Sequence, residues 1–420
     1  MASLIARYPR LQSLLIVVIA AATIILALPL LGLTITDVFS IAIILIVVLA
    51  LNFMAGYAGI PNFGMALFVY IGAFALAGVG TRVALALVEL TSPGFIELLR
   101  SSYPLILGDS SSFEVFVRVA GDPMVNRIVT RKVESVIEAS SILSLTLTLA
   151  VFGFAIIAGA LTGVLASLAA VRLREDYLAI VLLAFSELMV SVVFDQTDAL
   201  AGGPNGAWVV RPWPRVGALE GLAGLLGTIP DVLISLAVGL AVLAACFIYV
   251  ERMANSPMGR MLRAMRDDDL TIRVYGRDVA VTRLKVMAIG AAMASIAGAI
   301  YATVYIQVKA ADTYDRVTWT FVPWAMMILG GMANNWGAVL GGIIVYLGRK
   351  AIYYYAPAIA SVISPILGVE ASIAGDILRA QLPNILVGVL IILVLYLRPQ
   401  GIIPEKPSKT LSRREIEAIT

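Results

Sequence analysis

The sequence predicts an all-α, polytopic membrane protein, and three observations support that prediction. The chain has 420 residues, of which 60% are hydrophobic and only 14% are charged, whereas a soluble domain is nearer to half apolar and a quarter charged. The apolar residues gather in runs of about 17–25 residues, the length that crosses a bilayer as a helix. These runs do not alternate between apolar and polar residues, which excludes a membrane β-barrel.

About ten transmembrane helices are expected, some of them broken or re-entrant at Gly-rich segments. The apolar runs are 14–31, 38–56, 65–90, 142–171, 177–194, 232–250, 286–308, 321–347 and 382–397. The first is too long for a signal-peptide core, so we interpret it as an uncleaved span. The run 321–347 is broken by glycines. It forms either two short crossings around the break or one broken crossing, after which 351–367 returns.

The polar connections define the sides of the membrane. Residues 91–140 form an extracytoplasmic insert with one or two short helices, around 125–137. A second outer stretch, 195–230, carries Trp208 and Trp213, which suit the membrane interface. Because Lys and Arg beside short loops mark the cytoplasmic side, we place the loop 251–285 and the tail 398–420 in the cytoplasm. The chain 1–420 is then one transmembrane domain with both termini cytoplasmic.

The loop 251–285 predicts a short amphipathic helix. Ser256 is a good N-cap, Pro257 suits the first helical position, and Gly276 is a candidate stop. An apolar stripe at helical spacing comprises Met258, Met261, Leu262 and Met265, and Arg260, Arg263 and Arg266 lie off it. A helix this short has to rest on a partner protein, on its own bundle or on lipid.

The composition excludes several classes of function. The chain has no His and one Cys, Cys246, so an internal disulfide and a His/Cys metal site are both excluded, and no cofactor is expected. There is no phosphate-binding Gly-rich loop ending in Lys-Ser/Thr, so the chain is not expected to hydrolyse ATP. A net charge of +3, dispersed between loops, predicts no nucleic-acid partner.

Two Gly-rich breaks are consistent with an internal repeat. Asn62-Phe63-Gly64 precedes one small-residue-rich helix, and Asn335-Trp336-Gly337 precedes another. In transporters, paired discontinuous segments flank the solute path. Alternatively, the glycines only let helices pack closely. Asn52, Asn62 and Asn335 are therefore candidate residues of a translocation path, although Asn52 and Asn62 can instead satisfy backbone groups that a broken helix frees.

Glu187 is the one acid well inside a predicted span. Acids within the membrane are costly and face the bundle interior or a wet cavity. Three roles stay open: a structural hydrogen bond between helices, a place on the solute path that meets an ammonium group, and a proton relay.

Four stretches carry a resemblance to a known family. They read LNFMAGYAG (51–59) with NFG (62–64); REDYLAIV (174–181) with Glu187 and GGPNG (202–206); SPMGR (256–260) with RAMRDD (263–268); and LGG (329–331), WG (336–337) and RPQG (398–401). Together they span about 36–405 and resemble the M-type permease subunit of branched-chain amino-acid ABC importers. A His that usually follows the early motif is missing, and the segments 91–140 and 356–379 look longer than usual.

The resemblance implies a plasma-membrane permease that is not itself an enzyme. Its expected partners are a second permease subunit, two ABC ATPase subunits, and an extracytoplasmic binding protein that delivers branched-chain or related small amino acids. The helix in 251–285 would couple to the ATPase, with its apolar stripe in a groove of that partner. The coupling residues implied are Met258, Gly259, Arg260, Leu262, Arg263, Arg266, Asp267, Asp268 and Gly276.

Two alternatives to this interpretation remain. The amphipathic helix can instead lie on membrane lipid, with its arginines on the headgroups. The chain can also be a proton- or ion-coupled secondary transporter of a small solute, which would need no ATPase and would depend on Glu187.

Overall fold

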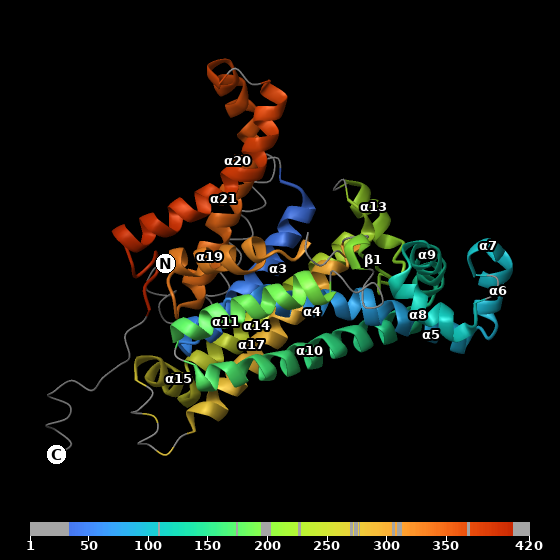
Figure 1. Ribbon diagram of the computed structural model, residues 1–420, viewed down its shortest axis with the longest axis horizontal. Coiled ribbons are helices and arrows are strands. Elements are labelled where there is room, and N and C mark those ends of the chain that lie inside the picture. Colours follow the sequence, from blue (N-terminus) through green and yellow to red (C-terminus); the bar gives the residue numbers. More distant parts are fainter. Residues whose placement is uncertain are drawn as a thin grey trace, which may run out of the picture.

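The computed structural model describes residues 33–107, 110–173, 175–194, 203–225, 228–268, 272, 276, 278–304, 307–308, 313–367 and 370–405. Within these ranges the chain is a bundle of helices (Figure 1). The expected first span, 14–31, and the tail beyond 405 lie outside the described residues.

Six helical segments among the described residues are long and apolar enough to cross a membrane. They are Ile35–Tyr57, Met65–Thr91, Ser141–Leu168, Pro230–Ala254, Val279–Ala302 and Ser372–Leu397. Two shorter apolar helices, Tyr177–Val192 and Val317–Gly330, accompany them. The chain is therefore an all-α polytopic membrane protein, as its sequence predicted. The two-residue strands β1 (Ala207–Trp208) and β2 (Gln307–Val308) pair antiparallel.

The elements follow one another in two halves. The first half comprises α3 (Ile35–Leu51), η1 (Asn52–Tyr57), α4 (Met65–Phe74), η2 (Ala75–Gly80), α5 (Thr81–Thr91), α6 (Phe95–Ser102), α7 (Pro104–Leu107), α8 (Ser112–Gly121), α9 (Pro123–Ala139), α10 (Ser141–Arg172), α11 (Glu175–Glu187) and η3 (Leu188–Phe194). The second half comprises η4 (Gly203–Asn205), α13 (Ala218–Leu225), α14 (Pro230–Ala254), α15 (Pro257–Asp267), α17 (Val279–Ala302), η5 (Val317–Phe321), α19 (Val322–Gly330), α20 (Asn335–Leu367) and α21 (Ala371–Leu397).

The central element of the bundle is α3 together with η1, since 89% of its most apolar 18-residue window is buried. It packs against α14, α17, α19 and α20. Asp37, which directly precedes the predicted run 38–56, lies in the first turn of α3 and accepts hydrogen bonds from the backbone N–H and the hydroxyl of Thr34. η1 is a π-helical turn, and three further π turns, η2, η3 and η5, adjoin other helices.

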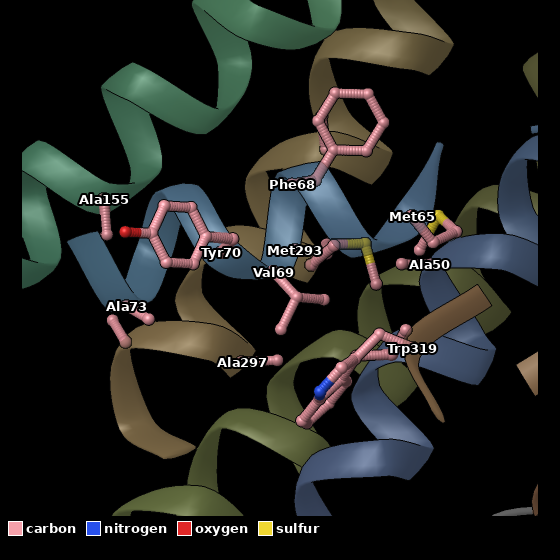
Figure 2. Packing of buried hydrophobic residues seen from close by; sticks show 14 of the residues in the cluster. Ala50, Met65, Phe68, Val69, Tyr70, Ala73, Ala155, Met293, Ala297 and Trp319 are labelled. Carbon is pink, nitrogen blue, oxygen red and sulfur yellow. The ribbon is translucent and has the colours of Figure 1, made fainter. Parts of the chain in front are cut away.

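α4 and α17 form a close helix pair at the centre of the core (Figure 2). Val69 of α4 lies near Met293 and Ala297 of α17. A Cβ atom added to Gly298 would lie 1.8 Å from the carbonyl oxygen of Val69. Only glycine therefore allows the two backbones to approach so closely.

The apolar stretch 321–347 forms a helical hairpin, which decides between the two arrangements left open. α19 ends at Gly330, and α20 turns back along it so closely that a Cβ on Gly341 would lie 2.1 Å from the Met326 carbonyl oxygen. The turn uses positive φ angles at Gly331 and Ala333. The alternative in which residues 351–367 form a separate helix that runs back along the bundle is wrong. α20 continues without a break to Leu367, and α21 is the helix that runs back. The two helices project from the body of the bundle (Figure 1).

The insert 91–140 holds four helices, α6 to α9, rather than one or two, and α9 covers the expected 125–137. These helices lie at one end of the long helices, and α15 lies at the other (Figure 1). Trp213, which we expected at the membrane interface, packs within the protein. Its side chain is buried, and its indole N–H donates to the Ser235 hydroxyl at 2.8 Å inside the bundle.

Candidate functional site

α15 is the amphipathic helix that the sequence predicted. The Ser256 hydroxyl accepts a hydrogen bond from Gly259 N at 3.3 Å, and Pro257 occupies the first turn. The helix ends at Asp267, so the expectation that it runs to Gly276 was wrong. Gly276 has a φ of +71° in an exposed turn nine residues later, a conformation that suits glycine but lies outside the helix.

The apolar stripe of α15 packs on the chain's own bundle. Leu262 and Met265 are 1% and 3% exposed, and Met258 is half-buried. Gly259 allows the close approach, because a Cβ there would lie 2.4 Å from the Ala254 carbonyl oxygen at the end of α14. The expectation that the stripe enters a groove of a partner is therefore corrected. The stripe instead fixes the helix to the bundle.

Two arginines of α15 bind one carboxylate of the C-terminal segment. Arg263 Nε lies 2.8 Å from Glu405 Oε1, and Arg266 Nη2 lies 2.9 Å from Glu405 Oε2. Arg266 Nη1 also donates to the Gly56 carbonyl oxygen at 2.8 Å. Burial lowers the pKa of Arg266, but the hydrogen bond and charge of Glu405 outweigh it, so its pKa is raised. Both guanidinium groups are thus bound within the chain.

The opposite face of α15 is exposed. Besides Gly276, the exposed members of the residues expected to couple to a partner are Arg260 and Asp267 of α15 and its C-cap, Asp268. Asp267 Oδ1 lies 3.2 Å from Arg266 Nε, a contact between neighbouring residues. The surface that α15 presents away from the bundle is therefore charged and carries both signs.

The segment that carries Glu405 is attached to the break between α19 and α20. Ile402 N donates to Leu329 O and Ile403 N to Gly330 O, each at 2.9 Å. The Asn334 side chain donates to Pro404 O at 3.0 Å. The hydrogen bonds of this segment, 401–405, therefore join α15 to the hairpin of α19 and α20.

Asn52 and Asn335, expected to belong to a solute path, meet in a buried polar network beside α15. Asn52 Nδ2 donates to Asn335 Oδ1 at 3.1 Å, and the Tyr57 hydroxyl donates to the same oxygen at 3.2 Å. Asn335 Nδ2 donates to Glu251 Oε2 at 2.8 Å. Asn52 Oδ1 accepts from Ala333 N at 2.9 Å. The network links η1, α14 and the start of α20, and Asn52 satisfies freed backbone as the structural alternative expected.

Asn62 has a comparable local role. Its Oδ1 accepts a hydrogen bond from Gly64 N at 2.8 Å, just before α4. In the second break it is Asn334, not Asn335, that caps the helix, through Trp336 N and Gly337 N at 3.1 Å. In both breaks an Asn side chain therefore accepts hydrogen bonds from backbone N–H groups at the start of the next helix. The residue that corresponds to Asn62 is Asn334, one position before the Asn335 that the sequence suggested.

Glu187 lies at the end of α11 and lines a cavity of about 200 Å³. Its Oε1 lies 3.0 Å from Arg316 Nη1 and accepts a hydrogen bond from the Ser191 hydroxyl at 3.3 Å. The carboxylate is 42% exposed, so it has both a structural partner and access to the cavity. The sequence could not show Arg316 as its partner, because the two residues are 129 positions apart and belong to different elements.

The comparisons with known proteins agree with this architecture. Residues 33–395 match the family model for the permease component of branched-chain amino acid transport systems. The chain is 32% identical over 365 residues to the "Probable branched-chain amino acid transport permease protein LivM" of Methanocaldococcus jannaschii, covering 86% of this chain and 90% of that protein. It is 25% identical over 259 residues to the "High-affinity branched-chain amino acid transport system permease protein LivM" of Escherichia coli, covering 58% and 55%.

A protein of the same description from Salmonella typhimurium is also 25% identical over 259 residues. No solved structure matches the chain. The family model and the Methanocaldococcus relative both cover most of the chain, and the described residues form apolar helices of membrane-spanning length. The chain therefore belongs to the family of permease components of branched-chain amino acid transport systems.

Proposed function

We propose that this chain is the membrane-spanning permease subunit of an ATP-driven importer that takes up branched-chain or related small amino acids. The solute class is supported by the names of the relatives. The coupling to ATP is supported by one observation above all. α15 is held to its bundle by Leu262, Met265 and Glu405, while Arg260 on its other face is exposed.

This arrangement suits a lever. A partner ATPase would bind the exposed charged face, and the buried face would transmit its movement. The movement would reach the α19–α20 break through Glu405 and the segment 401–405, and η1 through the contact of Arg266 with Gly56 O. Closure of the ATPase pair on ATP would then shift the bundle between outward-open and inward-open arrangements, because the two arrangements differ in their contacts with the ATPase.

The proposal includes the setting of the subunit. It lies in the plasma membrane with α15 and both termini in the cytoplasm. It pairs with a second permease subunit and two ABC ATPase subunits, and receives solute from an extracytoplasmic binding protein. The insert 91–140 would then lie on the outer side, which is consistent with its position at the end of the bundle opposite α15 (Figure 1).

Co-purification with an ATPase subunit tests the coupling. Arg260→Glu reverses the exposed charge of α15 without touching its buried contacts, and should lower the amount of co-purified ATPase about tenfold or more, as expected for a lost charged contact at an interface. Arg252→Glu, on the exposed surface of α14 nearby, is the matched control. Substitutions of Arg263 or Leu262 are less informative, because both residues also hold the chain together.

Two outcomes would overturn the proposal. One is an Arg260→Glu variant that binds the ATPase as well as the parent chain does. The other is amino-acid uptake into vesicles that contain this chain but neither ATPase nor ATP, which is the result that a secondary transporter predicts.

A further inference from the structure

A second cavity, larger than the one beside Glu187, lies where α20 and α21 meet the start of η5. Its volume is about 490 Å³, within the range of about 300–1,000 Å³ that small-molecule sites usually have. It is lined by Asp315, Val317, Thr318, Tyr346, Arg349, Lys350, Tyr353, Arg379, Ala380, Pro383 and Asn384. Four of these side chains are charged: Asp315, Arg349, Lys350 and Arg379.

The side chains that line this cavity carry a net positive charge. Arg349, Lys350 and Arg379 line it, against the single carboxylate of Asp315. Lys350 is neutralised from outside the cavity by Asp37, whose Oδ1 lies 2.7 Å from its Nζ. Arg379 Nη1 lies 3.7 Å from Asp376 Oδ1, a long contact with a side chain that is 80% exposed.

Arg349 is the most informative of the three cations. Its Nη1 is buried and has no hydrogen-bond partner among the residues that the structure describes. A buried, charged donor without an acceptor costs free energy, so such groups in native proteins usually meet a partner. A guanidinium group offers two parallel N–H donors, a geometry that fits a carboxylate.

The other two cations are oriented by one ring. The Tyr353 ring lies 5.8 Å from Lys350 Nζ and 5.7 Å from Arg379 Cζ, so cation–π contacts hold both groups at the cavity wall. Tyr353 therefore helps to collect positive charge beside Arg349 from two different helices, α20 and α21.

The cavity is placed to receive solute. It shares Asp315 and Val317 with the cavity beside Glu187, so the two cavities adjoin the same segment of chain. Lys350 pairs with Asp37 in the first turn of α3, whereas α15 lies at the far end of η1. The 23 residues of α3 and η1 rise about 35 Å at 1.5 Å per residue, roughly the thickness of a membrane.

We propose that Arg349, supported by Lys350 and Arg379, binds the carboxylate of the amino-acid solute on the side of the membrane opposite α15, with Asp315 facing its ammonium group. The identity of the solute rests on the proposed function. The charge complementarity is that of a free zwitterion. A carboxylate and an ammonium group on a common carbon match the three cations and the one carboxylate of the lining. Asp315 Oδ1 also accepts hydrogen bonds from Val317 N at 2.8 Å and Thr318 N at 2.9 Å, which hold this carboxylate in place.

The test is binding of radiolabelled leucine to the full-length chain in nanodiscs of phosphatidylcholine. Arg349→Gln should weaken binding about tenfold or more, the loss expected for a hydrogen bond between charged groups. Arg379→Gln, a half-exposed change that should leave the fold intact, should weaken it by a smaller factor. Leucinamide, which lacks the carboxylate, should compete poorly with leucine for the parent chain.

The control variants show whether a loss of leucine binding is specific to this cavity. Arg215→Gln removes an exposed arginine that pairs with Glu220, so it should bind leucine like the parent. Thermal unfolding of each variant in the same discs checks that it is folded. Leucine binding that is unchanged in both Arg349→Gln and Arg379→Gln would overturn the inference, as would equal competition by leucinamide.

A further arm tests the nature of the anion. If inorganic phosphate, or phosphatidylglycerol added to the discs, displaces leucine, then the cations serve a phosphate group and the carboxylate assignment is wrong. Failure here is distinct from failure of the proposed function. If the parent chain binds its ATPase through Arg260 but the Arg349 variants bind leucine normally, the proposed function stands and only the inference about this cavity is overturned.

Discussion

The two ends of α3 and η1 differ in how their polar groups are used. At the η1 end, Asn52, Tyr57, Asn335 and Glu251 form a hydrogen-bonded network next to the paired arginines of α15. At the Asp37 end, Arg349, Lys350 and Arg379 line one cavity, and Arg349 has a buried donor without a described acceptor. One end is saturated with internal contacts, whereas at the other end three cations line a cavity.

This difference suggests that the η1 end transmits movement and the Asp37 end binds a ligand. A saturated network makes the η1 end stiff, because any displacement breaks several buried hydrogen bonds at once. Such a region can transmit a movement but offers little to a ligand. The unsaturated end has charged groups available for binding, and it contributes correspondingly less to stability. If this is correct, substitutions at the η1 end should lower the free energy of unfolding more than substitutions among the charged groups at the Asp37 end.

The largest loss of stability should come from Asn335→Leu. This change removes the partner of Asn52, Tyr57 and Glu251 together, and each buried group left unsatisfied costs about 1–3 kcal/mol. We expect the free energy of unfolding in detergent to fall by about 3 kcal/mol or more. Gln381→Leu, which replaces an exposed amide on α21, is the matched control. An Asn335→Leu chain as stable as this control would refute the saturated network.

An intermediate loss should come from Glu405→Gln. The side chains of Arg263, Arg266 and Glu405 are 22–26% exposed, so their ion pairs are partly shielded from water. Removing the charge while keeping the shape should lower the free energy of unfolding by about 1–2 kcal/mol. ATP-driven uptake should fall further than stability does, because the link from α15 to the hairpin is weakened. Equal uptake by the variant and the parent would show that segment 401–405 transmits nothing.

The smallest loss of stability should come from Glu187→Gln. Its ion pair with Arg316 is 42% and 52% exposed, and exposed pairs contribute about 0–1 kcal/mol. Thermal unfolding should therefore be nearly unchanged, and ATP-driven uptake should persist. Abolished uptake in a chain of normal stability would instead favour the proton-relay role, and with it the secondary-transporter alternative.

Local patterns in the sequence predicted the local features correctly. The cap at Ser256, the stripe of Leu262 and Met265, and the helix of the insert at 125–137 each depend on residues within a few positions of one another. Their physics is that of one helix turn or one face, which the spacing of residue types expresses directly. The class of fold followed in the same way from the length of the apolar runs.

What the sequence could not predict depends on contacts between distant segments. Glu405 binds Arg263 from 142 positions away, and Asn52 bonds Asn335 from 283 positions away. The start of the seventh predicted run was also misplaced. α17 begins at Val279, because the Asp278 side chain caps it by accepting hydrogen bonds from Ala280 N and Val281 N. Polar residues such as Arg283 therefore belong to this helix, although the apolar run in the sequence starts only at residue 286.

The π turn η1 has a consequence for the chain's tolerance of mutation. A π turn holds one more residue than an α turn, so it rotates everything that follows it by about 100° about the helix axis. The Gly56 carbonyl oxygen meets Arg266, and the Tyr57 ring lies 5.2 Å from Arg263, only in this phase. Deleting a single residue between 52 and 57 would restore an ordinary helix and turn both groups away from α15, so this stretch should accept changes of side chain far better than changes of length.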